Sequence, residues 1–145
     1  MKKMFQVPAN SIAVDYALLI LRVGLGLMML THGMPKMEKL FSGEPIQFAS
    51  VFGLSPAISL GLAVFAEVFC AVLIMFGFAT RLASVPLVIT MLVAVLMIHG
   101  SDPFAKKEMG TLYLVGFSAI LLAGPGRFSL DHLISKRLSL SPAKL

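Results

Sequence analysis

The sequence predicts an all-α protein that crosses a membrane as a bundle of four transmembrane helices. Of its 145 residues, 58% are hydrophobic and only 13% are charged, which leaves too few polar residues to cover a soluble domain. Four long apolar runs stand out, and about 20 helical residues cross a ~30 Å hydrocarbon core. A transmembrane barrel would show alternating polar and apolar residues, and this sequence shows no such alternation. The chain is therefore predicted to be one integral membrane domain, residues 1–145, with spans at about 14–34, 57–78, 82–99 and 104–124.

The first span follows the basic segment MKKMFQVPANS. This start resembles a signal peptide, but the apolar run is too long for one and lacks a clear cleavage site, so we expect an uncleaved span. Glycine and proline at His32-Gly33-Met34-Pro35 predict its end. The connection that follows, PKMEKLFSGEPIQFASVFGLSP, predicts a short helix lying in the outer interface.

The remaining spans are bounded by turn and cap signals. Ala79-Thr80-Arg81 makes the second and third spans an antiparallel hairpin. Ser101-Asp102-Pro103 predicts the start of the fourth span, with Asp102 as the N-cap. Gly124-Pro125-Gly126 ends it, and SLDHLISKRLSL predicts a second interfacial helix at the C-terminus.

Basic residues predict the orientation. Seven lie on one side and four on the other: Lys2, Lys3, Arg81, Arg127, Lys136, Arg137 and Lys144 against Lys36, Lys39, Lys106 and Lys107. The positive-inside rule then places both termini in the cytoplasm, with the protein in the cell (inner) membrane. The net charge of +5 is explained by these flanks and does not indicate nucleic-acid binding.

Two charges are predicted to lie deep in the bilayer. At 1.5 Å per residue, Arg22 is about 12 Å from the cytoplasmic end of its span and Glu67 about 15 Å from the outer end. Ala63, Cys70 and Ala71 share a helix face with Glu67, and small residues mark helix–helix contacts. Glu67 is therefore predicted to face the bundle interior and to pair with Arg22. The pair is either a structural ion pair or a proton-accepting site beside a redox carrier.

A second group of polar residues is expected at the outer rim, where His32, His99 and Glu108 end or begin spans. Two histidines and a carboxylate are enough to hold a metal ion, although no helical i, i+4 spacing links them. The alternatives are ordinary interfacial hydrogen bonds or a site for a quinone headgroup. We predict no bound metal.

At the cytoplasmic face, Arg81 and Asp131 are expected to tie the hairpin turn to the C-terminal tail, either as a pair or through separate helix caps. The single cysteine, Cys70, excludes a disulfide and is expected to be a core residue.

Four features in this order resemble the DoxX family of small bacterial membrane proteins. They are LRVGLGLMMLTHGMPKM (21–37), AEVFCAVLIMFGFATRLAS (66–84), His99 followed by Glu108, and GPGRFSLD (124–131). The resemblance implies a four-helix membrane bundle associated with quinol-linked oxidoreduction. The positions that match the family pattern are Arg22, His32, Gly33, Lys36, Glu67, Gly77, Thr80, Arg81, His99, Glu108, Gly124 and Asp131.

The sequence leaves three function classes open. The first is a quinone-interacting membrane subunit, with a soluble or membrane oxidoreductase partner that supplies the redox cofactor. The second is a non-catalytic membrane anchor or assembly partner. The third, a small-solute carrier, is least favoured because four spans without an internal repeat enclose little space unless the protein forms a homo-oligomer.

Overall fold

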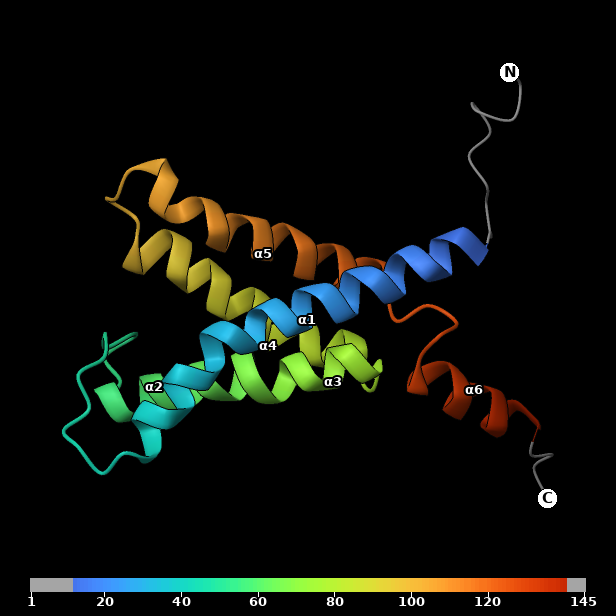
Figure 1. Ribbon diagram of the computed structural model, residues 1–145, viewed down its shortest axis with the longest axis horizontal. Helices are drawn as coiled ribbons and strands as arrows, with labels where there is room; N and C mark the ends of the chain where they lie inside the picture. Colours follow the sequence, from blue (N-terminus) through green and yellow to red (C-terminus); the bar gives the residue numbers. More distant parts are fainter. Residues whose placement is uncertain (1–11, 141–145) are drawn as a thin grey trace.

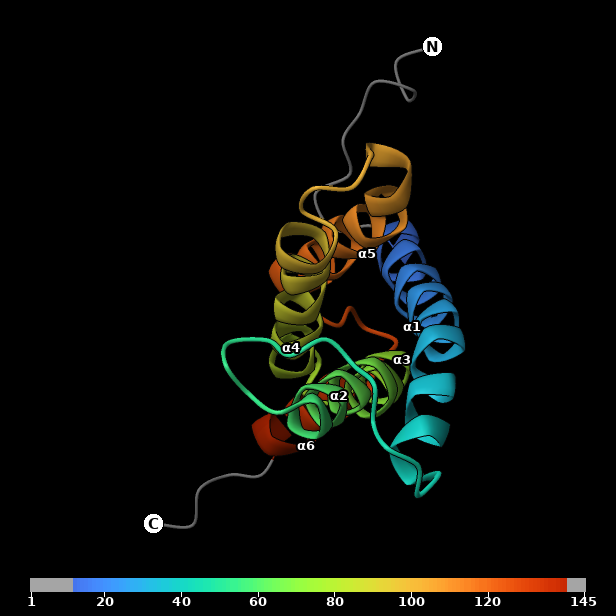
Figure 2. The same ribbon diagram turned by 90° about the vertical axis from the view of Figure 1, so that its left-hand side faces the viewer.

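The structure is a computed structural model that describes residues 12–140, and all of its regular structure is helical (Figure 1). Two of its long helices contain a π-helical segment. The elements are α1 (Ile12–Phe41), α2 (Pro56–Val64), η2 (Phe65–Cys70), α3 (Ala71–Phe76), α4 (Thr80–Val93), η3 (Ala94–Ile98), α5 (Phe104–Ala123) and α6 (Leu130–Leu140). Helices α2, η2 and α3 form one continuous rod, and α4 and η3 form another. Seen end-on, α1, the α2–α3 rod, α4 and α5 surround a shared core (Figure 2).

Three of these helical rods are long and apolar enough to cross a membrane: Ile12–Phe41, Pro56–Phe76 and Thr80–Ile98. Helix α5 has 20 residues, but Lys106, Lys107 and Glu108 lie in its first turn and a half and lower its hydropathy. Its outer face is nevertheless apolar, with Leu112 and Leu122 largely exposed. The prediction of a membrane-spanning helical protein is thus confirmed, while the fourth span remains a proposal.

Helix α1 is longer than the sequence predicted. It continues through Pro35 to Phe41. Proline removes a single intrahelical hydrogen bond, and membrane helices tolerate this loss when neighbouring helices hold them in place. The prediction of a separate short helix in the first outer loop is wrong. The start of that segment continues α1, and residues 42–55 contain no helix.

Helix α5 begins where the sequence predicted, but its N-cap differs from the prediction. Its N-cap is Pro103, without a side-chain cap, and the helix begins at Phe104. Asp102 instead contacts His99 and Lys106. The predicted C-terminal helix does form as α6, and its position at a membrane interface remains a proposal.

The core lies between α1, the α2–α3 rod, α4 and α5. The side chains with less than 2% exposure include Met29, Ala71, Ile74, Leu87, Phe117 and Ile120. The charged side chain of Arg22 is enclosed with them at 0% exposure. Its Nη1 donates to the Ile74 carbonyl at 3.2 Å and its Nη2 to the Phe128 carbonyl at 2.6 Å. Arg22 thus joins α1 to the end of α3 and to the segment after α5.

The prediction that Arg22 pairs with Glu67 is wrong. Side chains of a helix lean toward its N-terminus, so Arg22 reaches back toward the C-terminal carbonyls of α3, where the helix dipole attracts a cation. Its partner Ile74 lies seven residues beyond Glu67, which corresponds to about 10 Å of helical rise. The two charges are therefore at different levels of the bundle.

Asp131 fixes the α3–α4 turn to the C-terminal segment. Its carboxylate accepts hydrogen bonds from the amides of Ala79 at 2.7 Å and Thr80 at 2.9 Å, and from the Thr80 hydroxyl at 2.9 Å. The expected pair with Arg81 does not form, because the free amides at the start of α4 attract the carboxylate. Arg81 instead donates to the Leu122 carbonyl at 3.3 Å and lies against Gly124, whose φ of +83° suits glycine.

Lys2, Lys3 and Lys144, which contribute to the predicted orientation, lie outside the described residues. The segment MKKMFQVPANS, which resembles the start of a signal peptide, also lies outside the described residues.

Replacing Asp131 tests this connection. Asp131→Ala should lower the free energy of unfolding by about 1–3 kcal/mol, since the amides at the start of α4 lose their acceptors. Asp131→Asn, which keeps one acceptor oxygen, should lose less. Thermal unfolding in detergent measures both, with Glu44→Gln in the exposed 42–55 segment as the control. Equal stability of all three variants and the wild type would contradict this role for Asp131.

Candidate ligand-binding site

Glu67 lies in the π-helical segment η2 with only 2% of its surface exposed. Ala63, Cys70, Ala71 and Ile74 surround it on the same face and are buried as well. The predicted inward orientation is therefore confirmed. A π-helical turn is wider than an α-helical turn and is frequent at functional sites.

Lys36 of α1 is the partner of Glu67. Its Nζ lies 2.5 Å from Glu67 Oε1, and 32% of the lysine side chain is exposed. The sequence prediction missed this pair because it ended the first span near Pro35. The spacing carried a usable signal, since the buried α1 residues Arg22, Gly26, Met29 and Gly33 recur every four or three residues and Lys36 is next.

Gly33 brings the two helices close enough for this contact. A Cβ atom at this position would lie 2.7 Å from Val68 Cγ2 and 2.9 Å from the Glu67 carbonyl oxygen. Only glycine allows the α1 backbone to approach η2 so closely. Lys36, one helical turn further on, then reaches across to the carboxylate.

The second oxygen of the carboxylate is unsatisfied. Glu67 Oε2 is buried and has no hydrogen-bond partner among residues 12–140. A buried polar atom in this state costs about 1–3 kcal/mol. Oε2 is therefore available to accept a hydrogen bond from a bound molecule.

Two cavities meet at the Lys36–Glu67 pair. The larger, called the apolar cavity, has a volume of about 320 Å³ and lies between the 48–54 segment, α2, η2 and α4. Apart from Lys36, Glu67 and His99, its lining is mostly apolar, and includes Phe48, Val51, Phe52, Leu54, Leu62, Ala63, Ile89, Val93, Ala94 and Ile98. Its volume lies at the lower end of the range of about 300–1,000 Å³ found for small-molecule sites.

The smaller cavity, called the polar cavity, has a volume of about 180 Å³ and lies between α1, η2, η3 and α5. It shares Lys36, Glu67 and His99 with the apolar cavity. Its further polar lining residues are His32, Lys106, Lys107 and Tyr113. Glu67 therefore lies between the apolar cavity and a second cavity that has two further lysines in its lining.

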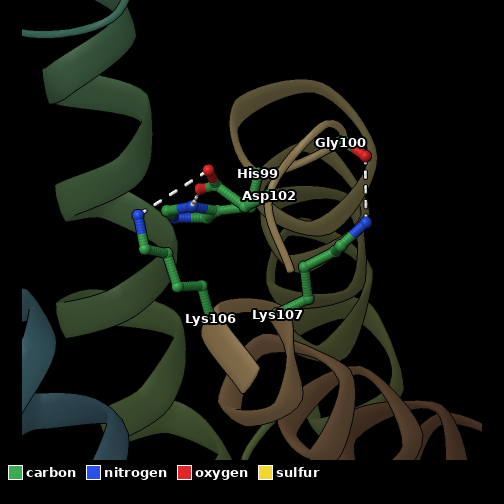
Figure 3. Close-up of polar contacts among 5 residues, drawn as sticks. All are labelled: His99, Gly100, Asp102, Lys106 and Lys107. Carbon is green, nitrogen blue, oxygen red and sulfur yellow. Dashed lines mark hydrogen bonds and ion pairs between the residues drawn. The ribbon is translucent and has the colours of Figure 1, made fainter. Parts of the chain in front are cut away.

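His99 is held by Asp102 at the end of η3 (Figure 3). The imidazole Nδ1 lies 2.8 Å from Asp102 Oδ2, and Lys106 Nζ lies 3.7 Å from Oδ1. The hydrogen bond from His99 lowers the pKa of Asp102, and the Lys106 charge lowers it further. Because an ionised carboxylate only accepts, Nδ1 carries the proton and Nε2 of a neutral ring is left as an acceptor.

The predicted outer-rim group does not assemble as a unit. His32 and His99 both line the polar cavity, and the His32 ring meets the Tyr113 ring edge-on at 5.6 Å. Glu108 lines neither cavity. Within residues 12–140, no three His, Cys, Asp or Glu side chains gather as a metal site would require. The metal alternative therefore has no support in this geometry.

Comparison with known proteins decides the family. The profile described as DoxX matches residues 17–100, more than half of the chain. The chain belongs to the DoxX family. The match includes Arg22, Lys36, Glu67 and His99 and ends before Glu108, so the resemblance of the later positions rests on the sequence pattern alone.

A second comparison also finds a membrane protein. A Mycobacterium tuberculosis protein (strain ATCC 25618 / H37Rv), described as an uncharacterized membrane protein, is 27% identical over 144 residues. The alignment covers 88% of this chain and 87% of that relative. No solved structure matches the chain significantly. The chain is thus a DoxX-family membrane protein.

Substitution of glycines in α1 tests the close helix crossing of this DoxX chain. Gly33→Ala should destabilise the protein by about 1–3 kcal/mol, because the new methyl group overpacks the contact with η2. Gly24→Ala is the matched control, since its Cβ would meet nothing within 4 Å in the described part of the chain. That variant should be as stable as the wild type or gain up to about 1 kcal/mol in helix propensity. Thermal unfolding in detergent that shows the same change for both variants would contradict the crossing.

The Asp102 contact has a pH dependence with a definite sign. Because the folded-state pKa lies below the ordinary value of 3.8, the contact adds stability above that value and loses it as pH falls through the lowered pKa. In a ¹³C NMR titration of labelled aspartates, His99→Leu should raise the Asp102 pKa toward 3.8. Lys106→Met should raise it less, and Asp102→Asn assigns the signal. A larger effect of Lys106→Met would contradict the dominant role of His99.

Proposed function

We propose that this DoxX-family protein binds a quinone or quinol in the apolar cavity and serves as the membrane subunit of an oxidoreductase system. The observation that carries the proposal is the buried Glu67 carboxylate, which is paired with Lys36 on one oxygen and unpartnered on the other, at the inner end of an apolar cavity. A group of this kind inside a membrane protein is a functional-site hypothesis by default.

The lining residues suit the chemistry of a quinone ring. The Lys36 ammonium has donors left for a ring carbonyl, and Glu67 Oε2 accepts from a quinol hydroxyl. His99 provides a second acceptor at the same cavity. The apolar side chains deeper in the cavity, Phe48, Val51, Ala63 and Val93, enclose the ring itself.

Reaction at the ring moves two electrons and two protons. Glu67 and His99 are the groups at the cavity that can exchange the protons, and the polar cavity next to both connects them to Lys106 and Lys107. The single cysteine cannot supply the ligands of an iron–sulfur cluster. The proposal therefore assigns the electron donor to a partner subunit.

The proposed setting is the cell (inner) membrane, with both termini in the cytoplasm and α5 as the fourth span. The distribution of basic residues supports this orientation. The end that carries His99 and the 42–55 segment then faces the outer side.

A non-catalytic membrane anchor is the second candidate. Arg22 and Asp131 favour it, because their hydrogen bonds serve only to join segments of the chain. A small-solute carrier is the third candidate, and it would require a homo-oligomer to enclose a path. The anchor and the carrier candidates both predict that the purified protein retains no quinone.

Quinone binding by purified protein tests the proposal. The protein is isolated in mild detergent, its bound quinone is extracted and quantified, and a short-chain quinone is titrated by calorimetry. Glu67→Gln and Lys36→Met should each weaken binding about tenfold to a hundredfold, since a hydrogen bond to a charged group contributes roughly 1.5–3 kcal/mol. Glu38→Gln and Lys136→Met, both at exposed positions outside the two cavities, are the matched controls and should bind as the wild type does.

A folding defect must be separated from a binding defect. Removing Lys36 alone leaves a buried charge uncompensated, whereas the double variant Lys36→Met/Glu67→Gln removes both charges together. The double variant should therefore fold with near wild-type stability and still fail to bind. Wild-type binding by the double variant, or a wild-type protein that binds no quinone, would contradict the proposed function and favour the anchor.

A further inference from the structure

We infer that the ligand of this site is a single-tailed lipid that enters sideways from the bilayer, with its tail lying between Leu62 of α2 and Ile89 of α4. The inference rests on the proposed function and adds the access route and the residues that select for a tail. It concerns the mouth of the apolar cavity, which is distinct from the polar groups at its inner end.

The cavity has a closed floor and an open, apolar mouth. At the floor, Ser59, Ala63 and Glu67 are 6%, 8% and 2% exposed. At the mouth, Leu62 and Ile89 are 55% and 52% exposed although they line the same cavity. The exposed side chains are aliphatic, so the opening suits hydrocarbon and not water.

The mouth lies at membrane depth. Leu62 is six residues after Pro56 and Ile89 is nine residues before Ile98, the bounds of the two apolar rods. At 1.5 Å per residue these positions are about 9 and 14 Å below the ends of the rods, within one leaflet of a ~30 Å core. A ligand that passes between them therefore comes from the acyl-chain region.

The 48–54 segment covers the cavity from the loop end of the bundle. In Figure 2 the chain between α1 and α2 passes across α2 and α4, and residues 48, 49, 51, 52 and 54 line the cavity. The Val51 amide donates to Ser59 Oγ at 3.2 Å, and Lys39 Nζ donates to the Gln47 carbonyl. These contacts tie the segment to α2 and to the end of α1.

Phe52 is held in this segment at a backbone cost. Its φ of +54° is left-handed, which for a bulky non-glycine residue costs roughly 1–3 kcal/mol. Phe52 is 71% exposed and lines the cavity. An aromatic side chain that both lines the cavity and is exposed is suited to pack on a tail that leaves the cavity.

The volume also requires that the tail leaves the cavity. At about 320 Å³ the space is at the lower end for a small-molecule site, enough for a ring and the first part of a tail. The rest of a long tail must therefore lie outside, and the opening between Leu62 and Ile89 leads into the bilayer.

Tryptophan substitutions test the route and report binding, because the chain has no tryptophan of its own. Ile89→Trp and Leu62→Trp narrow the mouth. Leu112→Trp is the matched control, since Leu112 is 62% exposed on α5, lies at a similar depth and lines neither cavity. Each variant is titrated with a long-chain isoprenoid quinone and with a tail-less quinone ring of the same substitution, by calorimetry and by tryptophan quenching.

The two mouth variants should bind the long-chain quinone at least about tenfold more weakly than the control, which corresponds to about 1.4 kcal/mol. They should bind the tail-less ring as the control does, which also shows that they are folded. Ile89→Phe, a smaller change, should give an intermediate loss. Equal weakening for both ligands, or no weakening for either, would overturn the access route while leaving the quinone site intact. Failure of the wild type to bind either ligand would overturn the proposed function and the access route together.

Discussion

A carboxylate enclosed within a membrane helix bundle is the constraint on which one half of this structure depends. Glu67 is 2% exposed, and a charge in such a place needs a cation or a proton. Lys36 supplies the cation only because α1 continues past Pro35 and crosses η2 closely at Gly33. The length of α1, the glycine contact and the course of the 42–55 segment therefore belong to one arrangement.

The two ends of the bundle differ in what their buried charged groups contact. Near Gly77, Arg22 and Asp131 bind backbone groups of three separate segments, which fixes those segments together. Near His99, both π-helical segments, both cavities and the unpartnered Glu67 oxygen occur together. Arg22 Nε is also buried without a hydrogen-bond partner among the described residues, but Arg22 lines neither cavity. The wide helical turns, the cavities and the unpartnered Glu67 oxygen therefore mark the His99 end as the one suited to a ligand.

The length of the apolar runs was enough to predict the apolar helical rods, and the helical spacing of small residues was enough to predict that Glu67 faces inward. The choice of its partner was not predictable from axial depth. Arg22 leans back along α1 toward the α3 carbonyls, and a depth estimate that uses only Cα positions omits this. The role of Lys36 was hidden because Pro35 looked like a helix end. Neither π-helical segment has a sequence signature, since an inserted residue changes the register of a helix without changing its composition.

The contact of Asp131 with the α3–α4 turn has a consequence for biosynthesis. Asp131 lies 52 positions after Ala79 and 51 positions after Thr80 in the sequence. The hairpin of the second and third helical rods is therefore translated well before the carboxylate that binds its turn. Until then the backbone amides of Ala79, whose φ is positive, and of Thr80 must donate their hydrogen bonds to water or lipid headgroups. A segment translated later therefore completes a turn formed much earlier. A chain interrupted before Asp131 would keep the three apolar rods and lack this connection.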